Sequence, residues 1–174
     1  RIVMLFVTLG GIFVVSALIG VLSNGLEDQM ERLRKGRSQV LENNHSLVLG
    51  WSPQIFTVLN ELMMANENQS NARIVVMADK DKVEMEDEIR ERVEVRGKTR
   101  IICRNGDPID PKDLEIASPH QAKSIIVLPP ETSDPDAHVI KTVMAITNNP
   151  NRRPQPYNIV TQIRKAENLG ILRI

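Results

Sequence analysis

The sequence predicts an α/β protein in which one membrane-spanning helix precedes a domain built on a doubly wound parallel sheet. Two observations lead to this fold class. Residues 2–23 contain no charged side chain, whereas residues 24–174 hold all 22 acidic residues and all but one of the 22 basic residues. In the charged part, short continuous apolar runs alternate with segments of helical periodicity, which is typical of parallel strands covered by helices on both faces.

The charge-free run of residues 2–23 has the length that a helix needs to cross about 30 Å of hydrocarbon. A secretory signal peptide would have a shorter apolar core after a basic stretch, and a domain of this size rarely buries a helix that is apolar on every face. Only Arg1 precedes the run, whereas basic residues follow it at Arg32, Arg34, Lys35 and Arg37. The positive-inside tendency therefore predicts an integral membrane protein with a cytoplasmic C-terminal part. We expect it in a bacterial cell membrane.

Gly10 and Gly11 are adjacent within the apolar run, and each removes a Cβ atom from the expected helix of residues 1–23. Two interpretations remain open, a flexible point at which the helix bends or a surface for close packing of membrane helices. Beyond the run, apolar residues keep helical spacing through a charged stretch. Residues 24–44 are therefore expected to form a helical linker that couples the span to the domain.

The domain is expected to occupy residues 45–174 and to be incomplete at its C-terminus. It begins with a buried strand at 45–51 and a helix at 53–66, with Ser52 as the N-cap and Pro53 as the first helical residue. Further strands are expected at residues 73–78, 100–104, 124–128 and 158–163. Further helices are expected at residues 80–93, 111–117 and 134–147 and from residue 165 onward. This order predicts a Rossmann-like domain.

Composition and motifs argue against several functions. The net charge is zero and 3% of residues are aromatic, so the sequence predicts no nucleic-acid partner. Cys103 is the only cysteine, which excludes an internal disulfide and a multi-cysteine metal site. His45, His120 and His138 are scattered along the chain, and no serine lies in a nucleophile elbow. The sequence therefore indicates no catalytic residues and no enzyme.

The first place to seek a ligand in such a sheet is the turn after the first strand, which here is Gly50-Trp51-Ser52. A dinucleotide fingerprint requires glycine at positions 50, 52 and 55, and only Gly50 matches. Ser52 offers a hydroxyl near a helix N-terminus, where an anion is favoured. The bulk of Trp51 and Ile55 argues against an ordinary NAD site. The turn either binds a dinucleotide or is a structural turn that has lost or changed its ligand.

Asp79 follows the second expected strand, at the position of the acid that binds ribose in dinucleotide-binding folds. A role as N-cap of the next helix fits it equally well. That helix carries carboxylates that could ligate calcium, at Asp81, Glu84, Glu86, Asp87, Glu88 and Glu91. Because the helix lacks the short-loop spacing and the glycine of a calcium loop, a solvated face is favoured.

The order of an apolar helix, a linker and a Rossmann-like domain resembles the potassium-conductance-regulating (RCK, or TrkA-N-like) domains of tetrameric cation channels. Asp79-Lys80-Asp81 and Asn105-Gly106-Asp107-Pro108 look like the second-strand acid and the Gly-Asp turn of those domains. The sequence is more similar to the CASTOR and POLLUX ion-channel family in Leu47-Val-Leu-Gly-Trp-Ser52, Val76-Met-Ala-Asp79 and Ile102-Cys-Arg104. A Gly-Trp-Ser turn in place of the dinucleotide glycines is itself a feature of that family.

This resemblance implies a subunit of a homotetrameric cation channel with a cytoplasmic gating ring. Residues 2–23 would be the pore-lining inner helix, with Gly10 and Gly11 as a gating hinge and with membrane lipid and permeating cations as partners. The candidate ligand crevice would be formed by Gly50, Ser52, Asp79 and Asp107. Regulatory Ca²⁺ or a nucleotide is what the resemblance suggests as ligand, and it assigns no metal-binding residue. The selectivity filter, and with it the choice between potassium and calcium, is expected upstream.

Two alternatives remain open. The first is a nucleotide-gated potassium channel or a potassium-uptake regulatory subunit. The second is a membrane-anchored NAD-dependent oxidoreductase, against which the missing glycines and the absent catalytic groups argue.

Overall fold

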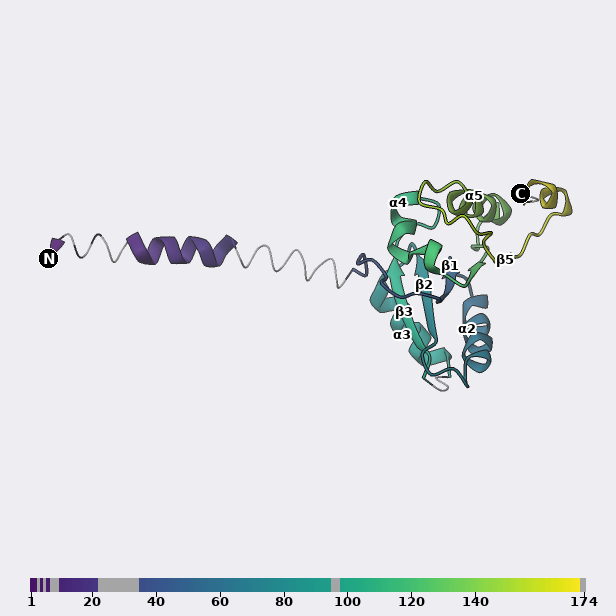
Figure 1. Ribbon diagram of the computed structural model, residues 1–174, viewed down its shortest axis with the longest axis horizontal. Helices are drawn as coiled ribbons and strands as arrows, with labels where there is room; N and C mark the ends of the chain where they lie inside the picture. Colours follow the sequence, from purple (N-terminus) through teal and green to yellow (C-terminus); the bar gives the residue numbers. More distant parts are fainter. Residues whose placement is uncertain (3, 5, 7–9, 22–34, 95–97, 173–174) are drawn as a thin grey trace. The chain divides into compact units, whose positions relative to one another are not determined.

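The computed structural model describes residues 1–174 apart from residues 3, 5, 7–9, 22–34, 95–97 and 173–174. The chain divides into two compact units, Arg1–Arg34 and Lys35–Ile174. In the first unit, residues 10–21 form a helix (Figure 1). Its large apolar side chains are exposed. Within the described residues, no helix combines the length and the apolar character needed to cross a bilayer. The expected span of residues 2–23 falls partly outside the described residues and stays a prediction.

The second unit is built on a five-stranded parallel sheet with the order β3-β2-β1-β4-β5. The strands are β1 Ser46–Leu49, β2 Arg73–Ala78, β3 Arg100–Asn105, β4 Ser124–Val127 and β5 Ile159–Thr161. β1 lies at the centre, where Val48 is in register with Val76 on one side and with Ile126 on the other. All four residues of β1 are buried. Because both faces of this strand are covered, its sequence is a continuous apolar run rather than an alternating one.

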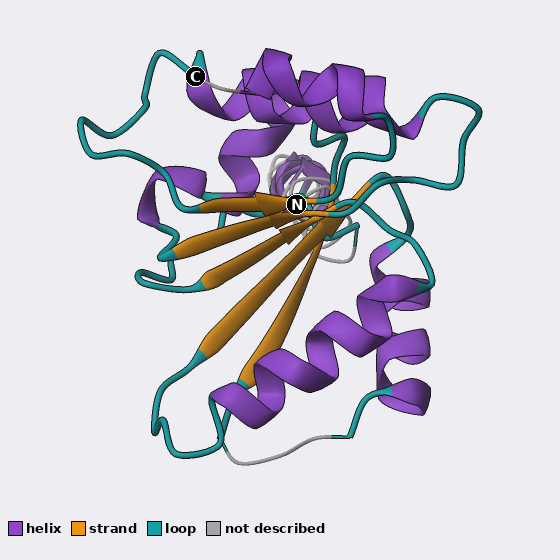
Figure 2. Ribbon diagram, turned by 90° about the vertical axis from the view of Figure 1, so that its right-hand side faces the viewer, coloured by secondary structure: helices purple, strands orange, loops and turns teal. Residues whose placement is uncertain are grey.

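Helices cover both faces of the sheet (Figure 2). The helices and helical turns are α2 Gln54–Ala65, α3 Lys82–Arg92, α4 Pro111–Leu114, η1 Glu115–Ala117, η2 Pro119–Gln121, α5 Pro135–Thr147 and η3 Ala166–Leu172. On one face, α2 and α3 pack against Val48 and Val76. On the other, α4, η1 and α5 pack against Leu47 and Leu49. Alternate residues of β1 thus belong to two separate cores, which confirms the expected doubly wound, Rossmann-like sheet.

Several expected boundaries are wrong. Residues 35–44, the described part of the expected helical linker, contain turns and bends but no helix. Gly36 there has a φ of +70°, and the Val40 amide donates to the carbonyl of Ile116 at 2.7 Å rather than within a helix. The helix expected at 111–117 divides into α4 and η1, and the one expected after Lys165 is the 3₁₀ segment η3.

Candidate functional site

Gly50 ends β1 in a conformation and a space that only glycine fits. Its φ is +92°, and its amide donates to the carbonyl of Met77 at 2.8 Å. A Cβ atom on Gly50 would lie 2.8 Å from the carbonyl oxygen of Leu128. The chain therefore turns at Gly50 between the ends of β2 and β4, and strand packing alone accounts for this glycine.

Trp51 lies where a dinucleotide would pass from the first turn to the acid after the second strand. Its ring meets the Phe56 ring of α2 edge to face, with centroids 5.9 Å apart. Trp51 also contacts Lys80, whose Nζ atom lies 5.3 Å from the indole centroid. The same Nζ atom lies 2.8 Å from a carboxylate oxygen of Glu88. The indole thus joins the turn after β1 to the turn after β2. This arrangement fills the approach that small residues leave open in a dinucleotide site.

Ser52 is buried, with 6% of its surface exposed, and its hydroxyl has no hydrogen-bond partner among the described residues. The expected N-cap role is wrong, because helix α2 has no side-chain cap bond and begins at Gln54, with Pro53 as its cap residue. At the start of α2, Ser52 forms a hydrogen bond only through its carbonyl, which accepts from the Ile55 amide at 2.9 Å. A buried hydroxyl without a partner costs stability unless another group supplies one. Ser52 is therefore the least satisfied of the four candidate crevice residues.

Asp79 is exposed directly after β2, and its carboxylate makes no hydrogen bond or ion pair within the described part of the chain. The alternative that Asp79 caps the next helix is wrong. Asp81 caps α3, accepting from the amides of Val83 at 2.8 Å and Glu84 at 3.2 Å. The structure thus leaves Asp79 uncommitted at the carboxyl edge of the sheet.

Asp107 is committed to its own turn. Its carboxylate accepts from the Ile109 amide at 2.9 Å, and its amide donates to a carboxylate oxygen of Asp113 at 3.1 Å. The other carboxylate oxygen of Asp113 pairs with the guanidinium of Arg37. The structure therefore brings Gly50, Ser52, Asp79 and Asp107 to one edge of the sheet, where the Asp79 carboxylate is exposed and uncommitted and the Ser52 hydroxyl is buried without a partner.

The segment that leads into the domain is attached at the same edge of the sheet. The Gly36 carbonyl accepts from the Asn105 amide at 3.2 Å, and the Ser38 carbonyl accepts from Nε of Arg104 at 2.7 Å. Together with the Arg37–Asp113 ion pair, these bonds fix residues 36–38 to the end of β3. Sequence reasoning missed this attachment, because Arg37 reads as one of several basic residues next to the apolar run.

His45 fixes the chain immediately before β1. It is fully buried, with Nδ1 3.0 Å from the Glu42 carbonyl oxygen and Nε2 3.2 Å from that of Ala117. Burial lowers the pKa of His45 below 6.5, although both carbonyls oppose this shift. A neutral imidazole donates from one nitrogen only, so one of the two carbonyls faces an unprotonated nitrogen.

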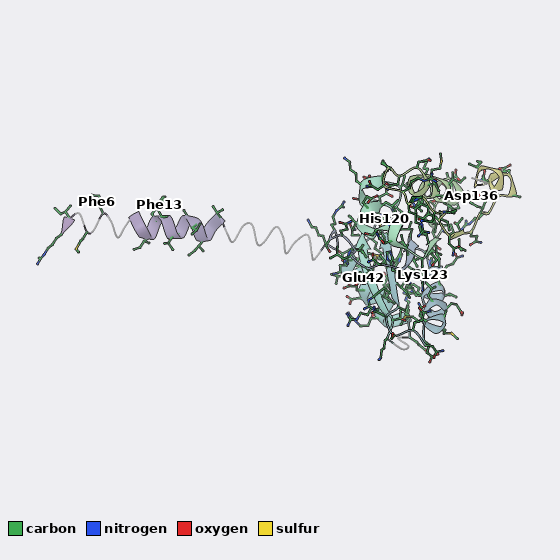
Figure 3. All side chains as sticks on the ribbon, in the orientation of Figure 1. Phe6, Phe13, Glu42, His120, Lys123 and Asp136 are labelled. Carbon is green, nitrogen blue, oxygen red and sulfur yellow. The ribbon has the colours of Figure 1, made fainter. Side chains whose placement is uncertain are left out.

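Asp136 is a second residue that sequence reasoning missed (Figure 3). Although it is charged, only 1% of its surface is exposed. Its carboxylate accepts from the amides of Arg164 and Lys165 and from the side-chain amide of Asn168, each at 2.9 Å. These hydrogen bonds lower the pKa of Asp136. It joins α5 to the segment after β5. The structural role of Asp136 is hard to recognise in the sequence because Asp134, two positions earlier, is the acidic residue that caps α5.

The acidic face of α3 is organised by ion pairs. Lys80 lies close to Glu84 and Glu88, Lys82 lies 3.6 Å from Glu86, and Arg90 lies 2.9 Å from Asp87. No group of three or more histidine, cysteine, aspartate or glutamate side chains within the described residues is arranged to hold a metal ion. The contacts on α3 are those of a solvated, ion-paired helix face.

Comparison with known proteins assigns the domain. The family model for the calcium-activated potassium channel slowpoke-like RCK domain matches residues 41–161. The chain belongs to the slowpoke-like RCK domain family. The match contains the whole sheet and every residue of the candidate crevice.

Curated relatives of this RCK domain confirm the resemblance to CASTOR and POLLUX ion channels. The probable ion channel CASTOR of Oryza sativa subsp. japonica is 39% identical over 150 residues, which cover 84% of this chain and 17% of the relative. The ion channel CASTOR of Lotus japonicus and the probable ion channel POLLUX of Arabidopsis thaliana are each 37% identical, with 84% of this chain and 18% of each relative covered. The chain thus spans less than one fifth of the length of these relatives.

Solved structures agree on the fold of the RCK domain. A structure of the GsuK RCK domain has a TM-score of 0.52 and 21% identity, over 84% of this chain and 28% of that chain. The GsuK channel bound to NAD has a TM-score of 0.51 and 20% identity, over 90% of this chain and 25% of that chain. At this identity the likeness shows the fold alone.

Proposed function

We propose that this RCK domain is the cytoplasmic regulatory domain of a cation channel subunit and that it acts on the pore through the segment attached to its sheet. The relatives named above as ion channels support the role in a channel. The attachment of residues 36–38 to the end of β3 supports mechanical coupling between the domain and the pore. This attachment is the observation that carries the proposal. A ligand bound at the carboxyl edge of the sheet would meet the same turns that hold the entering chain.

In this proposal, residues 1–23 form the pore-lining inner helix in the membrane, residues 24–44 connect it to the domain, and residues 45–174 form the regulatory domain. Four subunits assemble into a gating ring around one pore. Membrane lipid and permeating cations, potassium or calcium among them, are the partners of the whole protein. Ligand binding shifts the gate only to the extent that the closed and open forms bind the ligand with different affinity.

The regulatory ligand is proposed to be an anion or a nucleotide fragment rather than a complete dinucleotide. The GsuK channel, which shares this fold, has been solved bound to NAD, and this supports a nucleotide as the class of ligand. In the present chain, the Trp51 indole lies across the path between the two turns, whereas the Ser52 hydroxyl and the Asp79 carboxylate are uncommitted. A smaller group at Ser52 would satisfy the buried hydroxyl without displacing the indole. Ca²⁺ is the second ligand that the family suggests, and no residue is assigned to it.

Recording from the full-length protein in planar bilayers tests the proposal. Gly10 and Gly11 have no atom within 4 Å of an added Cβ in the described helix, so alanine fits at both positions. Replacing both with alanine removes flexibility worth about 1 kcal/mol per residue, which is enough to shift an open–closed balance severalfold. We expect the double variant to change open probability while ion selectivity stays the same. Absence of cation conductance in the full-length protein would contradict the proposal that it is a cation channel. Unchanged gating in the double variant would mean that the two glycines serve only helix packing.

A further inference from the structure

We propose that the amino-terminal ends of β2 and β3 form a binding pocket for a small oxyanion of the phosphate or phosphomonoester class. The pocket has a volume of about 450 Å³. It is lined by Ser70, Asn71, Arg73, Lys98, Thr99 and Arg100. Because parallel strands run in one direction, this pocket lies at the edge of the sheet opposite the crevice of Gly50 and Asp79.

Two arginines that line this pocket occupy paired positions on neighbouring strands. Arg73 of β2 and Arg100 of β3 are register partners, so their Cα atoms are separated by about the 4.8 Å spacing of adjacent strands. Side chains in register project on the same side of a sheet, and like charges placed directly opposite each other are destabilising. An anion bound between the two guanidinium groups would remove this repulsion.

The protein itself supplies little negative charge to these cations. Arg73 pairs with Glu42, whose carboxylate oxygen lies 3.7 Å from Nε of Arg73. Arg73 also donates from Nη1 to the Ala72 carbonyl at 3.1 Å, which holds its side chain in place. Neither Lys98 nor Arg100 forms an ion pair within the described part of the chain, although the pocket contains both. The described residues that line the pocket therefore include three cations, of which one, Arg73, is paired with a carboxylate.

The neutral residues of the pocket are also donors suited to an oxyanion. Ser70 and Asn71 offer a hydroxyl and a side-chain amide at the rim. A phosphate oxygen would accept from these groups and from the guanidinium groups. Arginine pairs bind phosphate oxygens in this way because their planar donors match the anion.

Calorimetry on the full 174-residue chain in detergent tests the site, with inorganic phosphate as the probe at constant potassium chloride concentration. We expect phosphate to bind, and Arg100→Gln and Arg73→Gln each to weaken it by about tenfold, since each removes a charge-assisted hydrogen bond. The control is Arg164→Gln, which removes the same charge from an exposed side chain after β5, the strand at the other edge of the sheet.

The outcomes separate cleanly. Absence of phosphate binding to the wild-type chain, or equal affinity of Arg100→Gln and Arg164→Gln, would overturn the proposal. Circular dichroism of each variant shows whether the fold is retained, and the exposed Arg100 is the variant least expected to disturb it. Sedimentation with vesicles of phosphatidic acid, against phosphatidylcholine alone, distinguishes a lipid headgroup from a soluble phosphomonoester. Arg100-dependent binding to the vesicles without binding of free phosphate would contradict the soluble ligand.

Discussion

The Nζ atom of Lys80 lies 5.3 Å from the ring centroid of Trp51, so the turn after β2 contacts the turn after β1 through a cation–π interaction. In a dinucleotide-binding sheet these two turns hold the two ends of one ligand segment, the pyrophosphate and the ribose. Here a side chain of the protein connects them instead. The sequence feature behind this difference is a single residue, tryptophan after Gly50.

The first prediction is that the chain binds NAD weakly or not at all. Displacing the indole would break its contacts with Phe56 and Lys80, and the ligand would have to compensate for both. Calorimetry with NAD and with NADH measures this directly. Micromolar affinity that is abolished by Asp79→Ala would show that the crevice is an ordinary dinucleotide site.

Gly50→Ala is expected to destabilise the domain by roughly 1–3 kcal/mol, because the new side chain must adopt a left-handed conformation against a carbonyl oxygen. The φ of Gly50 is +92°, and its Cβ would lie 2.8 Å from the Leu128 oxygen. Gly170→Ala is the matched control, since a Cβ there meets no atom within 4 Å. Urea denaturation of the two variants gives the comparison. Equal stability of both would show that the end of β1 can relax at no cost.

The pKa of His45 predicts a pH dependence of stability. Burial lowers this pKa in the folded chain, so the unfolded chain holds the proton up to a higher pH than the folded chain. Between the folded and unfolded pKa values the unfolded state binds more protons, so the free energy of unfolding increases as pH rises toward the unfolded value of about 6.5 and levels off above it. His45→Asn should flatten this slope. Denaturation between about pH 5.5 and about pH 7.5 measures both slopes. A slope that is the same in the His45 variant and the wild type would assign the effect to other groups.

Asp136→Asn tests the bonds between α5 and the segment after β5. The carboxylate accepts hydrogen bonds from three N–H groups, and an asparagine NH₂ group would face donors with a donor. We expect a melting temperature several degrees lower. Because the pKa of Asp136 is lowered on folding, its contribution is present above the unfolded value of about 3.9 and is lost as pH falls through the folded one. Asp87→Asn, on the exposed face of α3, is the control for loss of one charge. Equal melting temperatures of the two variants would contradict the structural role of Asp136.

The sequence predicted the sheet well because each strand is a continuous apolar run. β2 was predicted at its observed bounds, and β1 and β4 differ only at their ends. Residues 35–44 of the expected helical linker were predicted poorly, since helical spacing of apolar residues around residue 40 could not show that Val40 bonds instead to Ile116, and residues 24–34 lie outside the described residues. Long-range backbone pairing of this kind leaves no periodic signal in the chain.

The positions of the candidate crevice residues follow from the strands, whereas their chemistry does not. Strand ends can be located from apolar runs, so Gly50, Asp79 and Asp107 lie after β1, β2 and β3 as expected, and their role as a ligand crevice stays a prediction. Whether a polar side chain faces a ligand or its own turn depends on local geometry. Asp107 bonds to the Ile109 amide and Ser52 is buried without a partner, and both facts required coordinates.

The central claim is that the domain regulates the pore through the attached segment, and the Arg37–Asp113 ion pair offers the most direct measurement. The Arg37 side chain is 45% exposed, so its loss should not unfold the domain. Single-channel recording of the full-length protein would compare the wild type with Arg37→Gln and Arg37→Lys at one voltage in symmetric potassium chloride. Arg90→Gln, which removes an exposed ion pair within α3, is the matched control.

Exposed ion pairs contribute up to about 1 kcal/mol, so we expect Arg37→Gln to change open probability by about twofold to fivefold. Single-channel conductance and ion selectivity should stay the same. Arg37→Lys should have an open probability closer to that of the wild type because it keeps the charge. Arg90→Gln should have the open probability of the wild type. Open probability that is identical in Arg37→Gln, Arg90→Gln and the wild type would contradict transmission through this attachment.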